Sequence, residues 1–537
     1  MVSMKNNSSK LGLIKKALYI WIVQYHCVIP KEILKTYIHK FKHESENISK
    51  YGQRYYDPSN EQEYNKWLTM QEYECNDALF TDITFVGKDV SRLNTNGLAS
   101  VSMNVLDTSR IHTKYTCLVG EGIHLYEQFF SYLNTLDDSD VIYLDNDVYK
   151  DNERRNPKCK PDFSYHTLRG FNYIGNLVIV KTDILKQFNH TEVNIYEYLL
   201  ELSDQKVTWK HISKILYGDT EEEFDVYPLK KYIDKHNIDC KLLMQSNCAY
   251  LSYPVKENPF VSIMIPTKDG VEDLKKCIDS IFHKSSYKNY EIVIIDNNSE
   301  KEETFQYFKE IQDKHDNVHV YPLNIPFNFS IINNKAVEYS KGDYVVLMNN
   351  DTEVITNDWL EKMLSYAQLE NVGSVGVKLY YGDGSIQHGG VITGKGGGFA
   401  HRYYRKDHDE KGYMHTLDIP NDVACCTAAC LMVPKKKYLE VGGMNEELTV
   451  QFNDVDLGLR LIDHGYTNIF LPDVELYHYE SKSRGIDKDK KSVERYVSEV
   501  KYAEEHYSKW IEHDPFYNDN FDKNYDYMLK VGTGSNQ

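Results

Sequence analysis

The sequence predicts an α/β protein, and three observations in its second half support this. Runs of consecutive apolar residues at 261–265, 291–295 and 343–348 have the length and composition of buried strands. Between the first two runs, apolar residues recur at helical spacing from Val271 to Ile281. Each run ends in polar turn residues. Alternating strands and helices predict parallel β-α-β units in a sheet that is covered on both faces.

Further strands and helices are predicted from the same two patterns, apolar runs and helical spacing. A fourth apolar run at 318–321 and a helical stretch at 330–339 continue the alternation, and 253–260 is a linker before the first strand. In the first half, shorter apolar runs such as ITFVG, VIYLDND and YIGNLVIVK predict further strands between about 76 and 250. Residues 1 to 75 are polar and are predicted to be helical.

Charge and composition exclude some classes of protein. The 537-residue chain has a formal net charge of -18, so non-specific nucleic-acid binding through a basic face is excluded. None of the ten cysteines forms a C-x-x-C pair, which predicts core thiols in a reducing cytoplasm. The start of the chain lacks a signal-peptide pattern, and no apolar run approaches the ~18 residues of a membrane span. The stretch 11–23 predicts either a buried helix or a helix on a membrane surface.

Three strand ends in the second half carry polar residues: PTKD at 266–269, DNNS at 296–299 and NNDTE at 349–353. Each could be a simple turn. In a parallel sheet, however, all three would lie on the edge where ligands bind. Acids and amides without a basic clamp suit Mg²⁺ or Mn²⁺, which bridges carboxylates to phosphates. The sequence has no P-loop motif.

Two later segments add candidate residues to this edge. In FNDVDLGLRLIDHG, the apolar residues from Val455 to Ile462 form a helical stripe, so Asp454 lies at the start of a helix. Asp454 is either a helix cap or a positioned carboxylate that acts as a general base. His478 follows an apolar strand and is either structural or a metal ligand.

These motifs together resemble family 2 glycosyltransferases. VSIMIPTKD, IIDNNS, GDYVVLMNNDTEV, SIQHGGVI, GGMNEE, FNDVDLGLRL and YHYESKSRG occur in the order found in that family, across about 259–485. The resemblance is strongest to the bacterial branch that builds O-antigens, capsules and rhamnose-containing polysaccharides. It implies a GT-A fold and an inverting, metal-dependent transfer from a UDP- or dTDP-sugar to a glycan acceptor. One base and one metal suffice for inversion.

The resemblance also implies roles for individual residues. The nucleotide, diphosphate and sugar would be bound by Pro266, Thr267, Asp269, Asp296, Asn349, Asn350 and His388. Asp351 would be the main ligand of Mn²⁺ or Mg²⁺, with Asn349 replacing the first acid of the family's Asp-x-Asp element. His478 would be the second metal ligand. Asp454 would be the catalytic base, with Asp456 supporting it.

The first half resembles a second, tandem GT-A domain of the same branch that has lost its chemistry. Asp145 and Asp147 keep an Asp-x-Asp element. The acidic base segment is present only as VNIYEYLL at 193–200, and Gly218 replaces the late histidine. The alternative is a diverged domain that is still active.

The full prediction is therefore a tandem of two GT-A, Rossmann-like domains with mixed, mostly parallel sheets and helical extensions at both ends. The predicted division is a helical extension at 1–75, the degenerate domain at 76–250, the catalytic domain at 251–485 and a C-terminal helix and tail at 486–537. The enzyme would act in the cytoplasm, with peripheral contact at the inner membrane face, on an acceptor that can be lipid-linked. The alternatives are a nucleotidyltransferase and a non-catalytic glycan-binding scaffold on the same fold.

Overall fold

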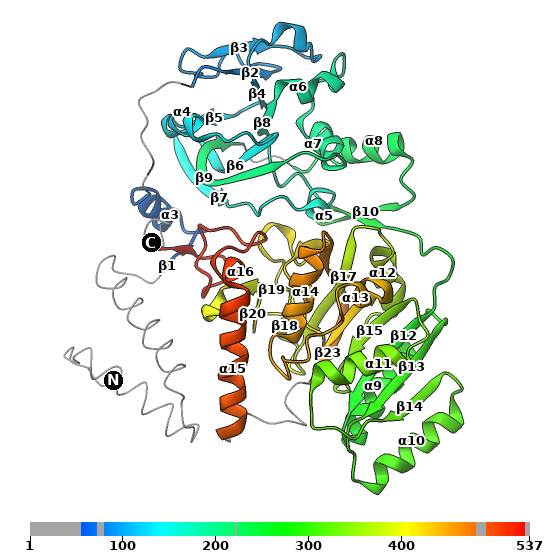
Figure 1. Ribbon diagram of the computed structural model, residues 1–537. Coiled ribbons are helices and arrows are strands. Elements are labelled where there is room, and N and C mark those ends of the chain that lie inside the picture. Colours follow the sequence, from blue (N-terminus) through cyan, green and yellow to red (C-terminus); the bar gives the residue numbers. More distant parts are fainter. Residues whose placement is uncertain (1–54, 72, 74–79, 221–222, 480–489, 532–537) are drawn as a thin grey trace, which may run out of the picture.

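The computed structural model describes residues 55–71, 73, 80–220, 223–479 and 490–531. Two large sheets dominate it, one in each half of the chain (Figure 1). The first half, blue to green, lies above the second half, green to orange. The stretch 11–23, which we considered as a surface helix, and the motif residues 480–485 lie outside the described residues.

The sheet of the second half begins with four parallel strands and is completed by antiparallel pairings and by the parallel pair β17–β23. Its strand order is β14-β13-β12-β15-β22-β17-β23-β16, with β18 and β21 pairing at its side. The strands are β12 (Val261–Thr267), β13 (Tyr290–Asp296), β14 (Val318–Pro322), β15 (Tyr344–Met348), β16 (Thr352–Val354), β17 (Val372–Tyr380), β18 (Ile386–His388), β21 (Asn421–Val423), β22 (Cys430–Pro434) and β23 (Thr467–His478).

Helices cover both faces of this sheet, as the fully apolar strands predict. Ile263 and Ile265 of β12 pack in one core with residues of α9 (Val271–Lys284) and α12 (Trp359–Ala367). Met264, between them, packs in another core with residues of α11 (Phe329–Tyr339). Because successive strand residues point to opposite faces, a strand buried on both sides needs an unbroken apolar run. The further helices of this half are α10 (Glu302–Lys314), α13 (Lys435–Glu440) and α14 (Asn453–Asp463).

The sheet of the first half is also mixed, with strand order β3-β2-β4-β8-β6-β9-β5 and β7 pairing with β6. Its strands are β2 (Ile83–Gly87), β3 (Ala99–Ser102), β4 (Tyr115–Val119), β5 (His124–Leu125), β6 (Val141–Lys150), β7 (Glu153–Lys158), β8 (Leu177–Lys181) and β9 (Trp209–Asp219). The helices of this half are α4 (Glu127–Tyr132), α5 (Tyr165–Leu168), α6 (Thr182–Leu185), α7 (Ile195–Ser203) and α8 (Tyr227–His236). A hairpin of β10 (Lys241–Gln245) and β11 (Cys248–Ser252) follows α8.

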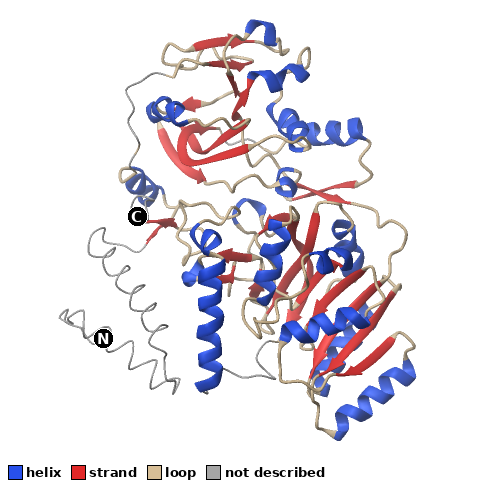
Figure 2. Ribbon diagram, viewed as in Figure 1, coloured by secondary structure: helices blue, strands red, loops and turns tan. Residues whose placement is uncertain are grey.

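The end of the chain returns to the beginning of its described part (Figure 2). After α15 (Lys490–His506) and α16 (Ser508–Glu512), the chain runs without a helix to β24 (Leu529–Lys530), which pairs with β1 (Tyr55–Tyr56). Trp67 of α3 (Glu61–Leu68) donates its indole N–H to the carbonyl of Lys530 at 3.0 Å. The segment 513–531 therefore connects the second half of the chain to the first.

The predicted α/β class with two sheet domains in tandem is confirmed. The apolar runs become strands at the expected places, and antiparallel strands extend each sheet beyond the parallel part. The GKGGG stretch at 394–398 forms the turn of a hairpin between β19 (Val391–Thr393) and β20 (Phe399–His401). A search of the described helices finds none with the length and hydropathy required to cross a membrane.

Candidate active site at the edge of the second sheet

The ends of β12, β13 and β15 meet at one edge of the second sheet. Thr267 and Asp296, the last residues of β12 and β13, are register partners. Asn350, just after β15, donates its amide N–H to the Thr267 hydroxyl at 3.0 Å. Asp296 itself accepts the backbone N–H of Ser299 at 3.0 Å. The structure thus brings together three strand ends that are far apart in sequence.

Asp351 and His478 form the acid–imidazole pair of this edge. Oδ1 of Asp351 lies 3.2 Å from Nε2 of His478, and the amide nitrogen of Asn349 also lies 3.2 Å from Nε2. Pairing of β16 with β23 places Thr352 opposite His478 and so fixes this approach. The two side chains are mostly buried, each about 10% exposed.

Gln387 orients the imidazole of His478. Its side-chain oxygen lies 2.7 Å from Nδ1 of His478. An amide oxygen can only accept, so Nδ1 of His478 donates to it, and Nε2 faces Asp351 and Asn349. This is the arrangement by which proteins prepare a histidine as a metal ligand. Sequence reasoning missed Gln387, although it stands next to His388 in the quoted IQHGGV motif.

Asp454 lies near the start of α14, as predicted. Oδ1 accepts the backbone N–H of Val455 at 2.9 Å, and Oδ2 accepts that of Ala428 at 3.1 Å. Its side chain is half-buried rather than enclosed. The residue before the helix, Phe452, has a left-handed backbone with φ 60°. The carboxylate is held in place by backbone donors and remains accessible.

The segment 427–429 connects Asp454 to the metal side of the edge. Ala428 binds Asp454, and the carbonyl of Ala429 accepts the backbone N–H of Asn349 at 3.0 Å. The backbone N–H of Thr427 points at Nε2 of His388 at 3.4 Å. Burial, with help from the nearby His401 and Arg402, lowers the pKa of His388 well below its usual range, so this imidazole is neutral.

Two of the predicted site residues have side chains that are already engaged within the protein. Asp269 accepts the backbone N–H groups of Lys301 and Glu300 and the Thr304 hydroxyl. Burial opposes ionisation of this carboxyl, but these donors outweigh it and lower its pKa. Asp269 therefore holds the loop before α10, a role that its position in the PTKD motif did not reveal.

Asp456 is the second engaged residue. It is paired with the guanidinium of Arg460 and accepts the hydroxyl of Tyr507 in the segment after α15. Its carboxyl is buried, with 1% exposure. These contacts allow Asp456 to support the base helix, but they leave it badly placed to receive a proton from a substrate.

Glu499 of α15 is a further residue that the sequence analysis missed. Its carboxylate accepts the backbone N–H groups of Thr449, Val450 and Gln451 at 2.8 to 3.0 Å. This fixes the loop that leads into α14 and Asp454. No local sequence signal marks Glu499, because its partners lie about fifty residues earlier in the chain.

The donor set fits a hard divalent cation that also binds a diphosphate. A carboxylate and a correctly protonated imidazole face each other at Asp351 and His478. The described residues contain no group of three or more acidic, histidine or cysteine side chains arranged to hold a metal. Mg²⁺ or Mn²⁺ commonly takes one or two protein ligands and completes its shell with water and substrate phosphate.

The corresponding acids of the first half have different surroundings. Asp145 accepts the backbone N–H of Lys160 at 2.8 Å, contacts His211 at 2.9 Å, and is bound by the side-chain amides of Asn518 and Asn520. Asp147 accepts the hydroxyls of Tyr64 and Tyr126 at 2.6 and 2.5 Å and the Nε–H of Arg154 at 2.6 Å. Both carboxyls are fully buried, with 0% exposure.

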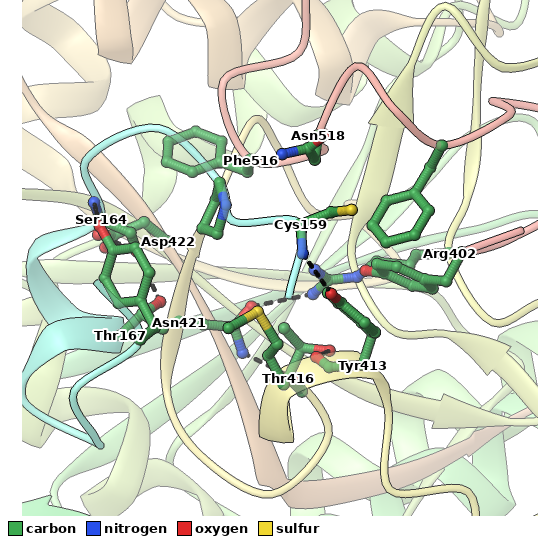
Figure 3. A pocket seen from close by; sticks show the side chains of 15 residues that line it. Cys159, Ser164, Thr167, Arg402, Tyr413, Thr416, Asn421, Asp422, Phe516 and Asn518 are labelled. Atoms are coloured by element: carbon green, nitrogen blue, oxygen red, sulfur yellow. Dashed lines mark hydrogen bonds between the residues drawn. The ribbon is translucent and has the colours of Figure 1, made fainter. Parts of the chain in front are cut away.

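The cavity in Figure 3 lies at the junction of the two halves, away from this edge. It is only about 30 Å³ in volume. Its wall combines Cys159 and Ser164 of the first half, Arg402 and Asp422 of the second, and Asn518 of the C-terminal segment. None of the predicted site residues lines it, so we place the candidate active site at the sheet edge.

Comparison with known proteins finds relatives of this chain. Residues 262–433 match the family model described as Glycosyl transferase family 2. Uncharacterized protein y4gI of Sinorhizobium fredii is 34% identical over 417 residues, which cover 71% of this chain and 45% of that protein. O-antigen biosynthesis protein RfbC of Myxococcus xanthus is 28% identical over 404 residues, 70% of this chain and 31% of that protein. The chain thus spans less than half the length of these two relatives.

A shorter match involves the N-acetylglucosaminyl-diphospho-decaprenol L-rhamnosyltransferase of Mycobacterium tuberculosis. It is 28% identical over 88 residues, 16% of this chain and 29% of that protein.

Among solved structures, mannosyltransferase PcManGT from Pyrobaculum calidifontis, in complex with GDP-Man and Mn²⁺, covers 44% of this chain and 61% of its own, with 16% identity and a TM-score of 0.33. GalNAc-T7 with UDP, GalNAc and Mn²⁺ covers 51% of this chain and 56% of its own, with 14% identity and a TM-score of 0.39. Scores this low carry no argument about the site. The sequence match of residues 262–433 assigns that domain to glycosyl transferase family 2.

Proposed function

We propose that this chain is an inverting, metal-dependent glycosyltransferase that moves a sugar from a UDP- or dTDP-sugar to a growing surface glycan. The observation that carries the proposal is the carboxylate of Asp454, which is held in place and accessible. Two backbone N–H groups hold it, and it is linked through 427–429 to the Asp351–His478 pair. A base on one side and a diphosphate-binding pair on the other are what inversion requires.

In the proposed reaction, Asp454 removes the proton from the acceptor hydroxyl as that oxygen attacks the anomeric carbon. The bond from that carbon to the diphosphate oxygen breaks, and the negative charge goes to the diphosphate. Asp351 and His478 would hold the divalent cation, which when bound stabilises that charge. The backbone N–H groups of Ala428 and Val455 keep the Asp454 carboxylate oriented for the proton.

The donor would lie across the ends of β12, β13 and β15. Pro266, Thr267 and Asp296 line the end proposed for the base and ribose, and Asn349 and Asn350 the end proposed for the diphosphate. His388, which is neutral, buried and bonded to Thr427, would face the sugar and acceptor side. The neutral state matters because a buried cation there would repel a metal at His478.

We further propose that the acceptor is a lipid-linked glycan at the inner face of the membrane. The support is the pair of relatives whose names refer to O-antigen biosynthesis and to a diphospho-decaprenol rhamnosyltransferase. The domain division at residues 75, 250 and 485 and a cytoplasmic location are parts of the same proposal. In it, the first half performs no transfer, which the saturated contacts of Asp145 and Asp147 support.

The test is a panel of UDP-, dTDP- and GDP-sugars, assayed for binding and slow hydrolysis with Mn²⁺, with Mg²⁺ and with excess EDTA. We expect one UDP- or dTDP-sugar to bind and hydrolyse only with a divalent cation. Full turnover in EDTA would refute metal dependence. Absence of any nucleotide-sugar binding would favour the glycan-binding alternative.

A further inference from the structure

The C-terminal segment 508–531 holds the hairpin β19–β20 from outside. Asp514 accepts the backbone N–H of Thr393 at 2.8 Å, and Asp526 both pairs with Lys395 and accepts the backbone N–H of Tyr403 at 2.8 Å. At Gly394 the contact is so close that an added Cβ would lie 2.2 Å from the carbonyl oxygen of Ile511. Gly394 thus serves this close approach as well as the turn.

On its inner side, the same hairpin borders the candidate active site. Nδ1 of His401 lies 2.9 Å from the backbone oxygen of Gln387, the residue that orients His478. The ring of Phe399 lies 5.6 Å from the ring of Phe452, two residues before Asp454. A displacement of the hairpin would therefore be felt at both the metal side and the base side of the edge.

At its other end, the C-terminal segment is anchored in the first sheet. Two hydrogen bonds from the Asn518 amide and one from the Asn520 amide reach Asp145, at distances of 2.9 to 3.1 Å. Pro515 accepts the backbone N–H of Asp162 at 2.7 Å, and His513 contacts the Asp162 carboxylate at 2.8 Å. Because hydrogen bonds to a buried carboxylate are strong ones, this anchor is firm.

We infer that Asn518, Asn520 and Asp145 are positioning residues for the hairpin beside the active site. Asp145, the first acid of the Asp-x-Asp element in the first half, accepts the hydrogen bonds that anchor the C-terminal segment. That segment in turn holds β19–β20 against Gln387 and Phe452. The role given to the hairpin rests on the proposed function, because His388 and Gln387 belong to the proposed sugar and acceptor side.

The experiment measures amide hydrogen exchange in the full chain carrying Asn518→Ala together with Asn520→Ala. Neither residue contacts the hairpin in any recorded hydrogen bond, so a direct effect is not expected. If the anchor positions the hairpin, amides at 391–401 should exchange about tenfold faster or more. Amides of β12 and β13 should keep their protection and serve as the internal reference. Asn65→Ala, at an exposed asparagine of α3, is the matched control.

A milder variant covers the case in which the double variant does not fold. His513→Gln removes one exposed contact to Asp162 and should accelerate exchange at 391–401 in the same direction but less. Unchanged hairpin exchange in whichever of these variants folds would overturn the inference.

Binding of UDP with Mn²⁺, measured in parallel, separates this inference from the proposed function. Because Gln387 orients the proposed metal ligand His478, the anchor variants should bind UDP with Mn²⁺ more weakly than the unaltered chain does. If the unaltered chain itself binds no UDP, the proposed function fails, whereas the exchange data still decide whether the segment positions the hairpin.

Discussion

Asp147 within β6 and Asp351 just after β15 are the last acids of two similar sequence elements, but their surroundings differ. Asp147 is fully buried and bonded by two tyrosine hydroxyls and an arginine. Asp351 faces Nε2 of the His478 imidazole at 3.2 Å. Burial raises the pKa of Asp147, although the positive charge of Arg154 opposes this. One acid stabilises the fold, whereas the other is left available for a cation.

This difference shows that an Asp-x-Asp spacing does not by itself make a metal site. A carboxylate accepts a metal only if its lone pairs are not already filled by protein donors. In the first sheet, those donors come from α3 and the C-terminal segment, which are distant in sequence, and from the neighbouring strand β7. The predictions below test whether the two edges differ in function as well as in contacts.

The largest effect should follow substitution of Asp454, the proposed base at the second edge. Asp454→Asn keeps the size of the side chain and its place at the helix start but cannot take a proton. We expect the transfer rate to fall about 10²–10⁴-fold while nucleotide-sugar affinity stays the same. Steady-state rates and calorimetric binding measure the two quantities.

Asp463→Asn is the control for this prediction. Asp463 lies on the same helix and pairs with Lys509 at the surface, so its loss should leave the rate unchanged. A rate for Asp454→Asn within a few-fold of the unaltered enzyme would mean that the proton goes elsewhere.

Substituting Asp351 and Asp147 separately tests whether the two acids have different roles. Asp351→Asn should abolish Mn²⁺-dependent UDP binding with little change in stability. Asp147→Asn should leave UDP binding intact but lower the free energy of unfolding by about 3–5 kcal/mol, because Arg154 loses the partner of a buried ion pair. Calorimetric titration with UDP and Mn²⁺ and urea unfolding separate the outcomes. Loss of nucleotide binding in Asp147→Asn would show that the first edge is a second active site.

The smallest expected effect is on the pH dependence of stability, through His513 of the C-terminal segment. Hydrogen bonds with Asp162 and then Asp519 raise the pKa of His513 to about 10. A raised folded-state pKa stabilises the protein fully below the unfolded value of about 6.5, and this contribution is lost as pH rises through about 10. Because His513 is 48% exposed, solvent screening limits its contribution to the free energy of unfolding to about 1 kcal/mol or less.

We therefore expect the free energy of unfolding to fall slightly between about pH 7 and pH 10, and to fall less in His513→Gln. Urea unfolding at several pH values measures this. An identical pH dependence in both proteins would show that the His513 contact does not help to hold the segment.

Much of the second half could be read from the chain because its signals are local. The apolar runs of β12, β13 and β15 and the stripe of α14 depend on residues a few positions apart, so periodicity located them. Thr267, Asp296, Asn350 and Asp351 follow strands of one parallel sheet, so the position of that sheet edge was enough to predict that they meet. Asp454 was predicted from its place at a helix start.

Other features depend on partners that lie far away in sequence. Tyr507 binds Asp456, and the residues before α10 bind Asp269. Gln387 orients His478, and Glu499 holds the loop before α14. These contacts could be predicted only by knowing which segments pack together. The antiparallel strands that complete each sheet have the same origin, because apolar runs do not encode the direction of the neighbouring strand.

The sequence by itself determined the α/β class, the edge that carries the acids and the family to which the motifs belong, since these follow from local spacing and residue type. Only the tertiary structure decided which acids remain available. Asp145 accepts amides from Asn518 and Asn520, and Asp351 meets His478, through contacts that span more than a hundred residues. The physical reason is that the reactivity of a carboxylate depends on which donors surround it, and folding brings those donors from anywhere in the chain.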